Sequence, residues 1–492
     1  MDKENLNGIP EEEIIKCSYC GRNEAAEGSE YCDACESKLL AKRIPFMGWA
    51  AGFVSLLAAV VLFTVAMSGT ILTSGVSSGD KYADDKNWHA AYEQYFEGYR
   101  KSVGRINVIN DFLNGIFETE QRAYVNPSLG IKKKMINVVA NYYGPLDAYY
   151  YATAFLSENE MAMPFMKDYT RIYQDFQTTY MTVEETSNKA FEENADYKAI
   201  LAEMDEYADK EGVNKVFLNY HKYVVAVNLD APVSEQIEIL KNIEKFAAES
   251  GDDYSWLSNP TMAQTLYDAG ETDETMVYLD KIIESNKSSY EAYRLKMKIQ
   301  VMAGDVEAAG ETVAEFSANY ENNELGYFAD VLEIEYLRCI GEYEKAEALC
   351  VEADESYKNV PETNGIMDLT YIIENRLIVP TEIYRQRALL LMTVGNYGDA
   401  FREIMEAYRM ETYYAQNIQC VTSLNDPKFY GTLYLSAFLA NSNNQVAEED
   451  MPDVEMVLGM FSEGSVSKEI DAIKNGEKTV KEVLAEGDFE AA

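Results

Sequence analysis

The sequence predicts a mainly α-helical protein in which a small cysteine module and one membrane-spanning helix precede a long helical region. Three observations predict this class. Four of the seven cysteines lie within residues 1–35, and a run of 22 uncharged residues begins at Phe46. The whole chain has many Tyr (37) and few Pro (11), and beyond this run it reads as one helix after another. This composition favours helices over strands.

The overall charge excludes some classes of function. The chain has 42 basic and 84 acidic residues, a net charge of −42 that repels nucleic-acid phosphate. It has only two histidines, His89 and His221, which disfavours a His-based triad or a His-rich metal centre. No nucleophile elbow, phosphate loop or H-E-x-x-H motif occurs. We therefore expect neither an enzyme nor a nucleic-acid-binding protein.

The N-terminal module, residues 1–43, contains two C-x2-C pairs, Cys17/Cys20 and Cys32/Cys35. Each pair places two thiolates on one tight turn, and two pairs complete a tetrahedral shell of four sulfurs. Because this shell leaves no open position, we expect one structural Zn²⁺ ion in a zinc ribbon, with iron as the minor option. Two redox motifs or a disulfide-stapled module are the alternatives. No βαβ pattern surrounds the cysteines, which disfavours the redox motifs.

The thiolates and the surface charge of this module indicate its surroundings. Reduced thiols place it in the cytoplasm. Its acidic residues disfavour the nucleic-acid binding that many zinc ribbons perform, because five acids accompany two bases: Glu24, Glu27, Glu30, Asp33 and Glu36 against Lys16 and Arg22. We expect the zinc ribbon to contact a cytoplasmic protein or to cap the inner end of the membrane helix.

Residues 46–67, FMGWAAGFVSLLAAVVLFTVAM, are long enough to cross a hydrocarbon core of roughly 30 Å. The alternatives are a buried core helix and a cleaved signal peptide, and the second would need a very long n-region. Basic residues precede the run at Lys38, Lys42 and Arg43, and Lys81 is the first to follow it, so the N-terminus stays in the cytoplasm. We expect a single-pass signal anchor in the cell membrane, a flexible Gly/Ser tether at 68–83, and an extracytoplasmic domain.

The outer region divides into an irregular helical part (84–210), a repetitive part (211–445) and C-terminal helices (446–492). Four stretches of the repetitive part share a helix, a turn glycine and a second helix with small residues: 262–283, 298–316, 335–353 and 390–408. Their glycines, Gly270, Gly304, Gly341 and Gly395, are separated by 34, 37 and 54 residues. The last interval therefore contains an extra element.

These stretches resemble tetratricopeptide repeats (TPRs), in which an aromatic or apolar residue follows the turn glycine by two positions and Ala by five. Tyr343 and Ala346 follow Gly341 in this way, as do Tyr397 and Ala400 after Gly395. Val306 and Ala309 fit more loosely after Gly304, and Thr275 replaces Ala after Gly270. The resemblance implies an all-α solenoid of helical hairpins that binds a protein or peptide. WHAAYEQYFEGYR (88–100) resembles the second helix of one repeat, and the tyrosines at 142–155 serve either helix packing or ligand stacking.

The resemblance also implies that the first helix of each repeat lines a concave face, on which basic residues clamp an acidic peptide or a C-terminal carboxylate. Arg294, Lys298, Arg338 and Arg385 occupy such positions. The alternative is that they pair with the local acids Glu291, Glu335 or Glu382. Cys339 and Cys350 fall on the two helices of one repeat, either as a disulfide or as separate buried thiols.

The order of the modules resembles that of a group of Gram-positive bacterial envelope proteins. We expect a membrane-anchored scaffold that binds a protein or peptide outside the cell. A transmembrane sensor, which would couple outer binding to a cytoplasmic partner of the zinc ribbon, is the second hypothesis, and an envelope hydrolase is the third. No pattern in the sequence identifies the partner or the oligomeric state.

Overall fold

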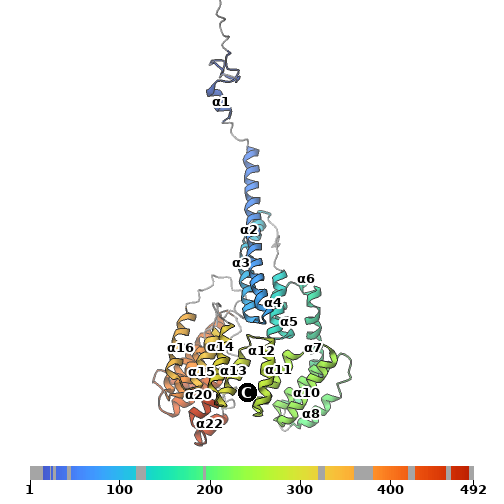
Figure 1. The fold of residues 1–492 in the computed structure, drawn as a ribbon, viewed down its shortest axis with the longest axis vertical. Coiled ribbons are helices and arrows are strands. Elements are labelled where there is room, and N and C mark those ends of the chain that lie inside the picture. The colour runs from blue at the N-terminus through green and yellow to red at the C-terminus, as the bar shows by residue number, and fades with distance from the viewer. Residues whose placement is uncertain are drawn as a thin grey trace, which may run out of the picture. The chain divides into compact units, whose positions relative to one another are not determined.

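The computed structural model describes residues 15–22, 24–25, 29–40, 46–117, 129–191, 195–319, 327–358, 381–418, 427–460 and 467–486 (Figure 1). These residues are predominantly helical, and their one extended pairing is an isolated antiparallel bridge between Lys16 and Glu24. The chain divides into two compact units, Met1–Thr70 with Ser102–Val125 and Ile71–Lys101 with Asn126–Ala492. The long helices α2 (Phe46–Asp84) and α3 (Trp88–Phe117) contribute to both units.

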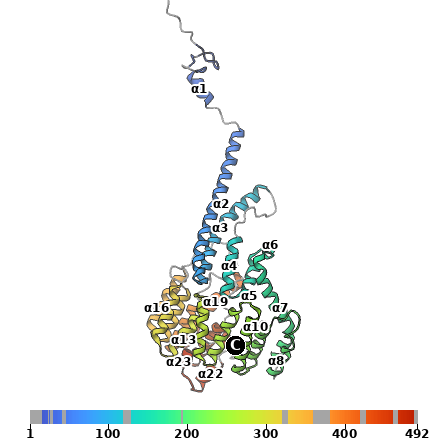
Figure 2. The ribbon, with the colours of Figure 1, turned by 45° about the vertical axis from the view of Figure 1, so that its right-hand side comes forward.

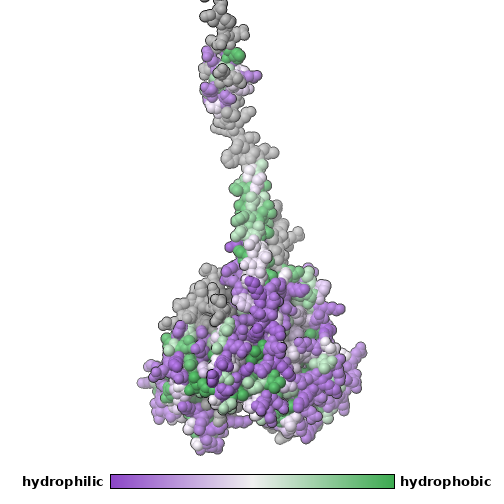
Figure 3. All heavy atoms as spheres, viewed as in Figure 1, coloured by the Kyte–Doolittle hydropathy of each residue, from purple (hydrophilic) through white to green (hydrophobic). Residues whose placement is uncertain are grey.

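The first unit contains α1 (Asp33–Leu40) and the apolar part of α2. By length and composition, α2 is the one described helix that could cross a membrane, over Ala50–Asp84. Its large side chains face outward: Phe53, Leu62 and Phe63 are each more than 60% exposed. Figure 3 shows this apolar surface in green. A core helix of a soluble domain would bury such residues, so the exposure disfavours that alternative.

The prediction of a flexible tether at residues 68–83 is wrong, because α2 continues as one helix to Asp84. The glycines in this stretch allow close helix packing. A Cβ atom added at Gly75 would lie 2.8 Å from the Cα atom of Gly98 in α3, and one at Gly79 would overlap the Tyr95 ring. Small residues at these positions therefore let two helices approach closely, which composition alone does not distinguish from a linker.

The second unit begins with the end of α2 and the start of α3. Both pack with α4 (Leu129–Tyr142) and α5 (Pro145–Phe155) around a core that includes Tyr95, Phe96 and Met135. Leu72 and Val76 of α2 pack against this core. The helices α6 (Glu158–Met161), α7 (Lys167–Asn188) and α8 (Tyr197–Asp205) complete this part of the unit.

A solenoid of helical hairpins follows, as the sequence predicts. Successive helices pair as antiparallel neighbours in chain order: α9 (Lys215–Asn228) with α10 (Val233–Ser250), α11 (Ser255–Asp268) with α12 (Thr272–Ser285), α13 (Tyr290–Met302) with α14 (Val306–Ala318), α15 (Tyr327–Cys339) with α16 (Tyr343–Lys358), α18 (Thr381–Thr393) with α19 (Tyr397–Ile418), and α20 (Pro427–Ser442) with α21 (Met451–Met460). The short helices α22 (Ser467–Lys474) and α23 (Val480–Glu486) end the described chain.

One turn geometry recurs between the paired helices. The predicted turn glycines Gly270, Gly304, Gly341 and Gly395 all have φ between 77° and 86°. At Gly341, the N–H of Glu342 donates to the carbonyl of Leu337, which is the six-residue bond of a Schellman motif. Asp230 and Asn444 take the same left-handed conformation in hairpins that lack the glycine, with φ of 50° and 56°. Short polar side chains tolerate this conformation better than most, so the turn persists without its sequence signature.

The hairpins stack through their first helices. Helix α13 packs on α15, α15 on α18, and α18 on α20, so these four helices form a row. Figure 2 shows the part of the solenoid that contains α13 and α16. Within the hairpins, the alanines five positions after the turn glycine are fully buried: Ala309, Ala346 and Ala400. Thr275 is equally buried in the hairpin that departs from the pattern. A small side chain at this position lets the two helices approach closely.

Candidate functional sites

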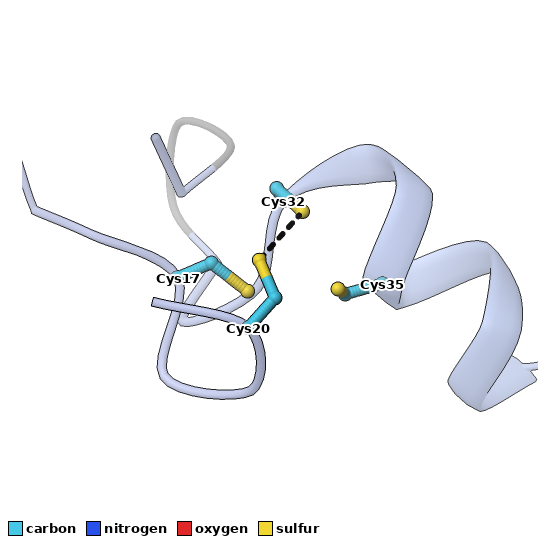
Figure 4. A group of neighbouring side chains, drawn as sticks. All are labelled: Cys17, Cys20, Cys32 and Cys35. Atoms are coloured by element: carbon cyan, nitrogen blue, oxygen red, sulfur yellow. Dashed lines mark hydrogen bonds between the residues drawn. The ribbon is translucent and has the colours of Figure 1, made fainter. Parts of the chain in front are cut away.

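The four N-terminal cysteines meet at one point in the first unit (Figure 4). Cys17 and Cys20 lie on a tight turn in which the N–H of Gly21 donates to the carbonyl of Cys17, 2.8 Å away. Gly21 has a φ of 64°, the left-handed conformation expected after the second cysteine of such a turn. Cys32 precedes α1 and Cys35 lies in its first turn, so the second pair comes from a helix start.

The sulfur geometry fits a metal ion. All four Sγ atoms lie within 4.8 Å of one another, and those of Cys20 and Cys32 are 3.9 Å apart. A tetrahedral shell with metal–sulfur bonds of about 2.3 Å requires sulfurs about 3.8 Å apart. A disulfide needs about 2.05 Å, and all four cysteines are free thiols. The described residues therefore assemble a four-sulfur site that can hold one metal ion.

The thiols themselves favour a bound cation. Burial would raise the pKa of Cys17, but hydrogen bonds from backbone N–H groups, with that of Cys32 first, outweigh it and lower the pKa to about 6. A hydrogen bond with the Cys32 side chain, together with burial, raises the pKa of Cys35 to about 12. Four crowded sulfurs therefore do not all ionise by themselves. A divalent cation at their centre would stabilise the thiolates that its coordination requires.

The four basic residues predicted to clamp a peptide lie in the row of first helices, and they are buried. Three of them converge on one carboxylate, Glu335 of α15. Arg294 donates to both Glu335 oxygens, at 2.6 and 3.0 Å. The amino group of Lys298 lies 3.3 Å from Glu335, and the guanidinium of Arg338 lies 3.7 Å from it. The sequence thus identifies residues that do come together, and it also identifies their acidic neighbour.

The fourth basic residue, Arg385, pairs within α18. Its Nε atom donates to Glu382 at 2.7 Å. Burial opposes the charge on Glu382, but the Arg385 guanidinium outweighs it and lowers the pKa of Glu382. The neighbouring side chain of Gln386 accepts a hydrogen bond from Arg338 at 3.2 Å, so the pair adjoins the Glu335 cluster. Glu291, the third acid named from the sequence, lies 3.5 Å from Arg294.

A second set of contacts was not anticipated from the sequence. The turn between α2 and α3 and the start of α3 are hydrogen bonded to the end of α12 and to the loop that follows α12. Lys86 Nζ donates to the carbonyl of Glu284 at 2.9 Å, Trp88 Nε1 donates to that of Ser285 at 2.8 Å, and the N–H of His89 donates to Ser288 Oγ at 3.0 Å. We call these contacts the latch.

The latch turn follows the repeat pattern without its glycine. Lys86 has a φ of 60°, Trp88 is the aromatic residue two positions later, and Ala91, five positions later, is fully buried. The resemblance of residues 88–100 to a second repeat helix was therefore the available signal. What it did not reveal is that the matching first helix is the end of α2.

The remaining downstream cysteines play no paired role in the described chain. Cys339 and Cys350 are both free, so the disulfide alternative is not realised here. Burial raises the pKa of Cys350 to about 12, which makes it a poor nucleophile. Cys420 lies outside the described residues, as does Glu27 of the N-terminal module.

Comparisons with known proteins do not identify a family for this chain. No family model matches the chain. No curated protein matches it either. Among solved structures, yeast Tom70 is similar over 84% of this chain and 100% of its own, at 12% identity and a TM-score of 0.25. The assignment of a TPR-like solenoid rests on the hairpins, turns and buried alanines described above.

Proposed function

We propose that this protein is a single-pass membrane scaffold whose helical-repeat domain binds a protein or peptide on the side of the membrane opposite the cysteine module. The row formed by α13, α15, α18 and α20 carries this proposal. Helical-repeat proteins use such stacked surfaces to bind partners. The exposed apolar part of α2 supports the membrane anchor, and the basic residues Lys38, Lys42 and Arg43 before it support a cytoplasmic N-terminus.

The binding chemistry that we propose is recognition of a carboxylate by Arg294, Lys298, Arg338 and Arg385. Three of these cations already surround Glu335, so their donors suit carboxylate oxygens. A partner's carboxylate would compete with Glu335 for the same donors. This proposal differs from a purely structural ion cluster in the effect of removing Glu335.

Two variants of the full chain distinguish these roles. Arg294→Ala with Lys298→Ala should reduce crosslinked partner at least tenfold, because the donors are lost. Glu335→Gln should preserve or increase capture, because it frees donors while its amide keeps the shape. Urea unfolding of both variants must accompany the assay, since a broken buried ion pair destabilises a fold. Equal loss of capture in both variants would indicate a structural role only.

We further propose that the cysteine module holds one structural Zn²⁺ ion through Cys17, Cys20, Cys32 and Cys35. The full chain should then contain about one zinc per molecule by elemental mass spectrometry. Cys32→Ser with Cys35→Ser should lose it, because two of four ligands disappear. Cys350→Ser, a buried thiol elsewhere, is the matched control and should retain it. Undiminished zinc in the double variant would contradict the assignment.

A transmembrane sensor is the second candidate, and the continuity of α2 favours it. Helix α2 continues from the apolar segment to Asp84, and its Leu72 and Val76 pack against the core of the second unit, whereas a flexible linker would make no such contacts. Deleting residues 1–37 while keeping the basic flank separates the two functions. A scaffold should retain activity in cells, and a sensor should lose it although partner capture persists.

A further inference from the structure

The end of α3 carries an exposed surface that neither the scaffold nor the metal site explains. Residues Ser102–Val125 belong to the same compact unit as the apolar segment of α2. One face of this part of α3 is buried, with Ser102, Ile106 and Ile109 each less than 10% exposed. Because both segments belong to one compact unit, an environment that surrounds the apolar segment also lies near the end of α3.

A neighbouring face of this helix, next to the buried one, carries basic residues first and apolar residues further on. Lys101, Arg105, Val108 and Phe112 recur every three or four residues and so share one face. All four are exposed, Val108 by 68% and Phe112 by 46%. Two large apolar side chains one turn apart form an exposed apolar patch, a feature that marks contacts with membranes or other proteins when it is rimmed by polar residues.

The local charge of the helix indicates which kind of partner covers Val108 and Phe112. Over residues 97–117 the chain has three basic residues, Arg100, Lys101 and Arg105, and two acidic residues, Glu97 and Asp111. This local excess of one positive charge contrasts with a net charge of −42 for the whole chain. Glu97 pairs with both Arg100 and Lys101, and Arg105 lies one turn beyond them. A basic face beside a membrane segment suits anionic lipid headgroups.

The order of residues along the helix also suits a membrane surface. Val108 and Phe112 lie three and seven residues beyond Arg105, which is a rise of about 5 to 10 Å. A cation at the start and apolar residues further on suit a helix that enters one leaflet from its surface.

We propose that the end of α3 is a second membrane contact, in which Lys101 and Arg105 bind anionic headgroups while Val108 and Phe112 enter the acyl region. This inference rests on the proposed membrane anchor. The lipid surface would then fix the rotation of α3 about the anchor as well as its distance from the membrane.

Photocrosslinking of the full chain in nanodiscs tests the proposal. One preparation contains phosphatidylglycerol with a photoreactive acyl chain, and the other contains phosphatidylcholine with the same group. We expect adducts on residues 46–67 with both lipids, and adducts on residues 106–117 at least threefold stronger with phosphatidylglycerol. Lys101→Glu with Arg105→Glu should lower the latter to the phosphatidylcholine level. Lys198→Glu with Lys345→Glu, which reverses two exposed lysines elsewhere, should not.

The labelling pattern distinguishes failure of the second membrane contact from failure of the membrane anchor. Labelled 46–67 with unlabelled 106–117 would overturn the second contact alone, and would indicate that a protein surface covers Val108 and Phe112. Labelling of 106–117 that ignores both lipid charge and the Lys101/Arg105 reversal would also overturn it. Absence of adducts from both segments would overturn the membrane anchor and this inference together.

Discussion

His221 of α9 is a buried base among aromatic side chains. The rings of Phe176, Tyr180 and Tyr220 lie 5.5 to 5.9 Å from its own ring, and Nε2 has no hydrogen-bond partner among the described residues. Burial lowers the pKa of His221 from 6.5 to about 4. The imidazole therefore stays neutral in the folded protein at pH values where the unfolded chain protonates it.

This shift predicts a pH-dependent stability with a defined sign. The folded pKa lies below the unfolded one, so the unfolded state binds the proton first and stability falls as pH falls from about 6.5 towards 4. Between pH 7 and pH 5 the wild type should lose about 2 kcal/mol of unfolding free energy beyond the loss in His221→Phe. Urea unfolding at both pH values measures the difference, and Tyr180→Phe should behave like the wild type. Parallel losses in wild type and His221→Phe would refute this reading.

The basic residues show how far single positions can be predicted. Repeat periodicity placed Arg294, Arg338 and Arg385 on equivalent helices, and the same reasoning named Glu335 as a local partner. The burial of these residues could not be predicted from the sequence, because it depends on which helices stack. Arg338, for example, also donates a hydrogen bond to the carbonyl of Leu484, 146 residues away. Contacts of that separation leave no periodic trace in a sequence.

The turns between paired helices form both with and without the glycine that identifies them in the sequence. A glycine at φ near 86° avoids the cost of a left-handed side chain, about 1–2 kcal/mol. At Gly270, Gly304, Gly341 and Gly395, the sequence identified the hairpin. Where Lys86, Asp230 or Asn444 replaces the glycine, the same hydrogen bonds form because packing of the two helices determines the turn. Glycine spacing alone therefore underestimates the number of hairpins.

Two glycine substitutions should have opposite effects on stability. Gly341→Ala meets no neighbouring atom but forces Ala to a φ of 86°, so it should lower the free energy of unfolding by about 1 kcal/mol. Gly459→Ala also meets no neighbour and lies in the last turn of α21, where the better helix propensity of Ala should raise stability by up to about 0.5 kcal/mol. Urea midpoints of the two variants check the signs. Destabilisation by both would show that space, and not backbone conformation, limits these sites.

Helix α2 is the element whose structure composition predicted least well. Ser and Gly at residues 68–79 indicated a linker by their residue type, yet α2 remains helical because Gly75 and Gly79 contact α3. The helix in this stretch depends on its contacts with Gly98 and Tyr95 of α3, and only the structure shows that these residues lie next to Gly75 and Gly79. The latch formed by Lys86, Trp88 and His89 was missed for the same reason, since its acceptors lie about 200 residues away.

At the scale of the molecule, the modules and their order were predictable while their junctions were not. Four close cysteines, one apolar helix and a solenoid each have a local signature in the chain. Helix α2 runs without a break from the apolar segment of the first unit into residues of the second unit, and no local signature in the sequence marks this continuity. The proposed scaffold and sensor functions both depend on the cysteine module and the repeats lying on opposite sides of the membrane.

Proteolysis of sealed right-side-out membrane vesicles that contain the full chain, tagged at both ends, tests this arrangement most directly. Added protease should remove the C-terminal tag and degrade the repeats, while the N-terminal tag survives on a membrane-bound fragment that includes α2. Detergent should then expose the N-terminal tag to cleavage. A protected C-terminal tag with a cleaved N-terminal tag, or release of the intact chain from the vesicles by alkaline carbonate, would contradict the account.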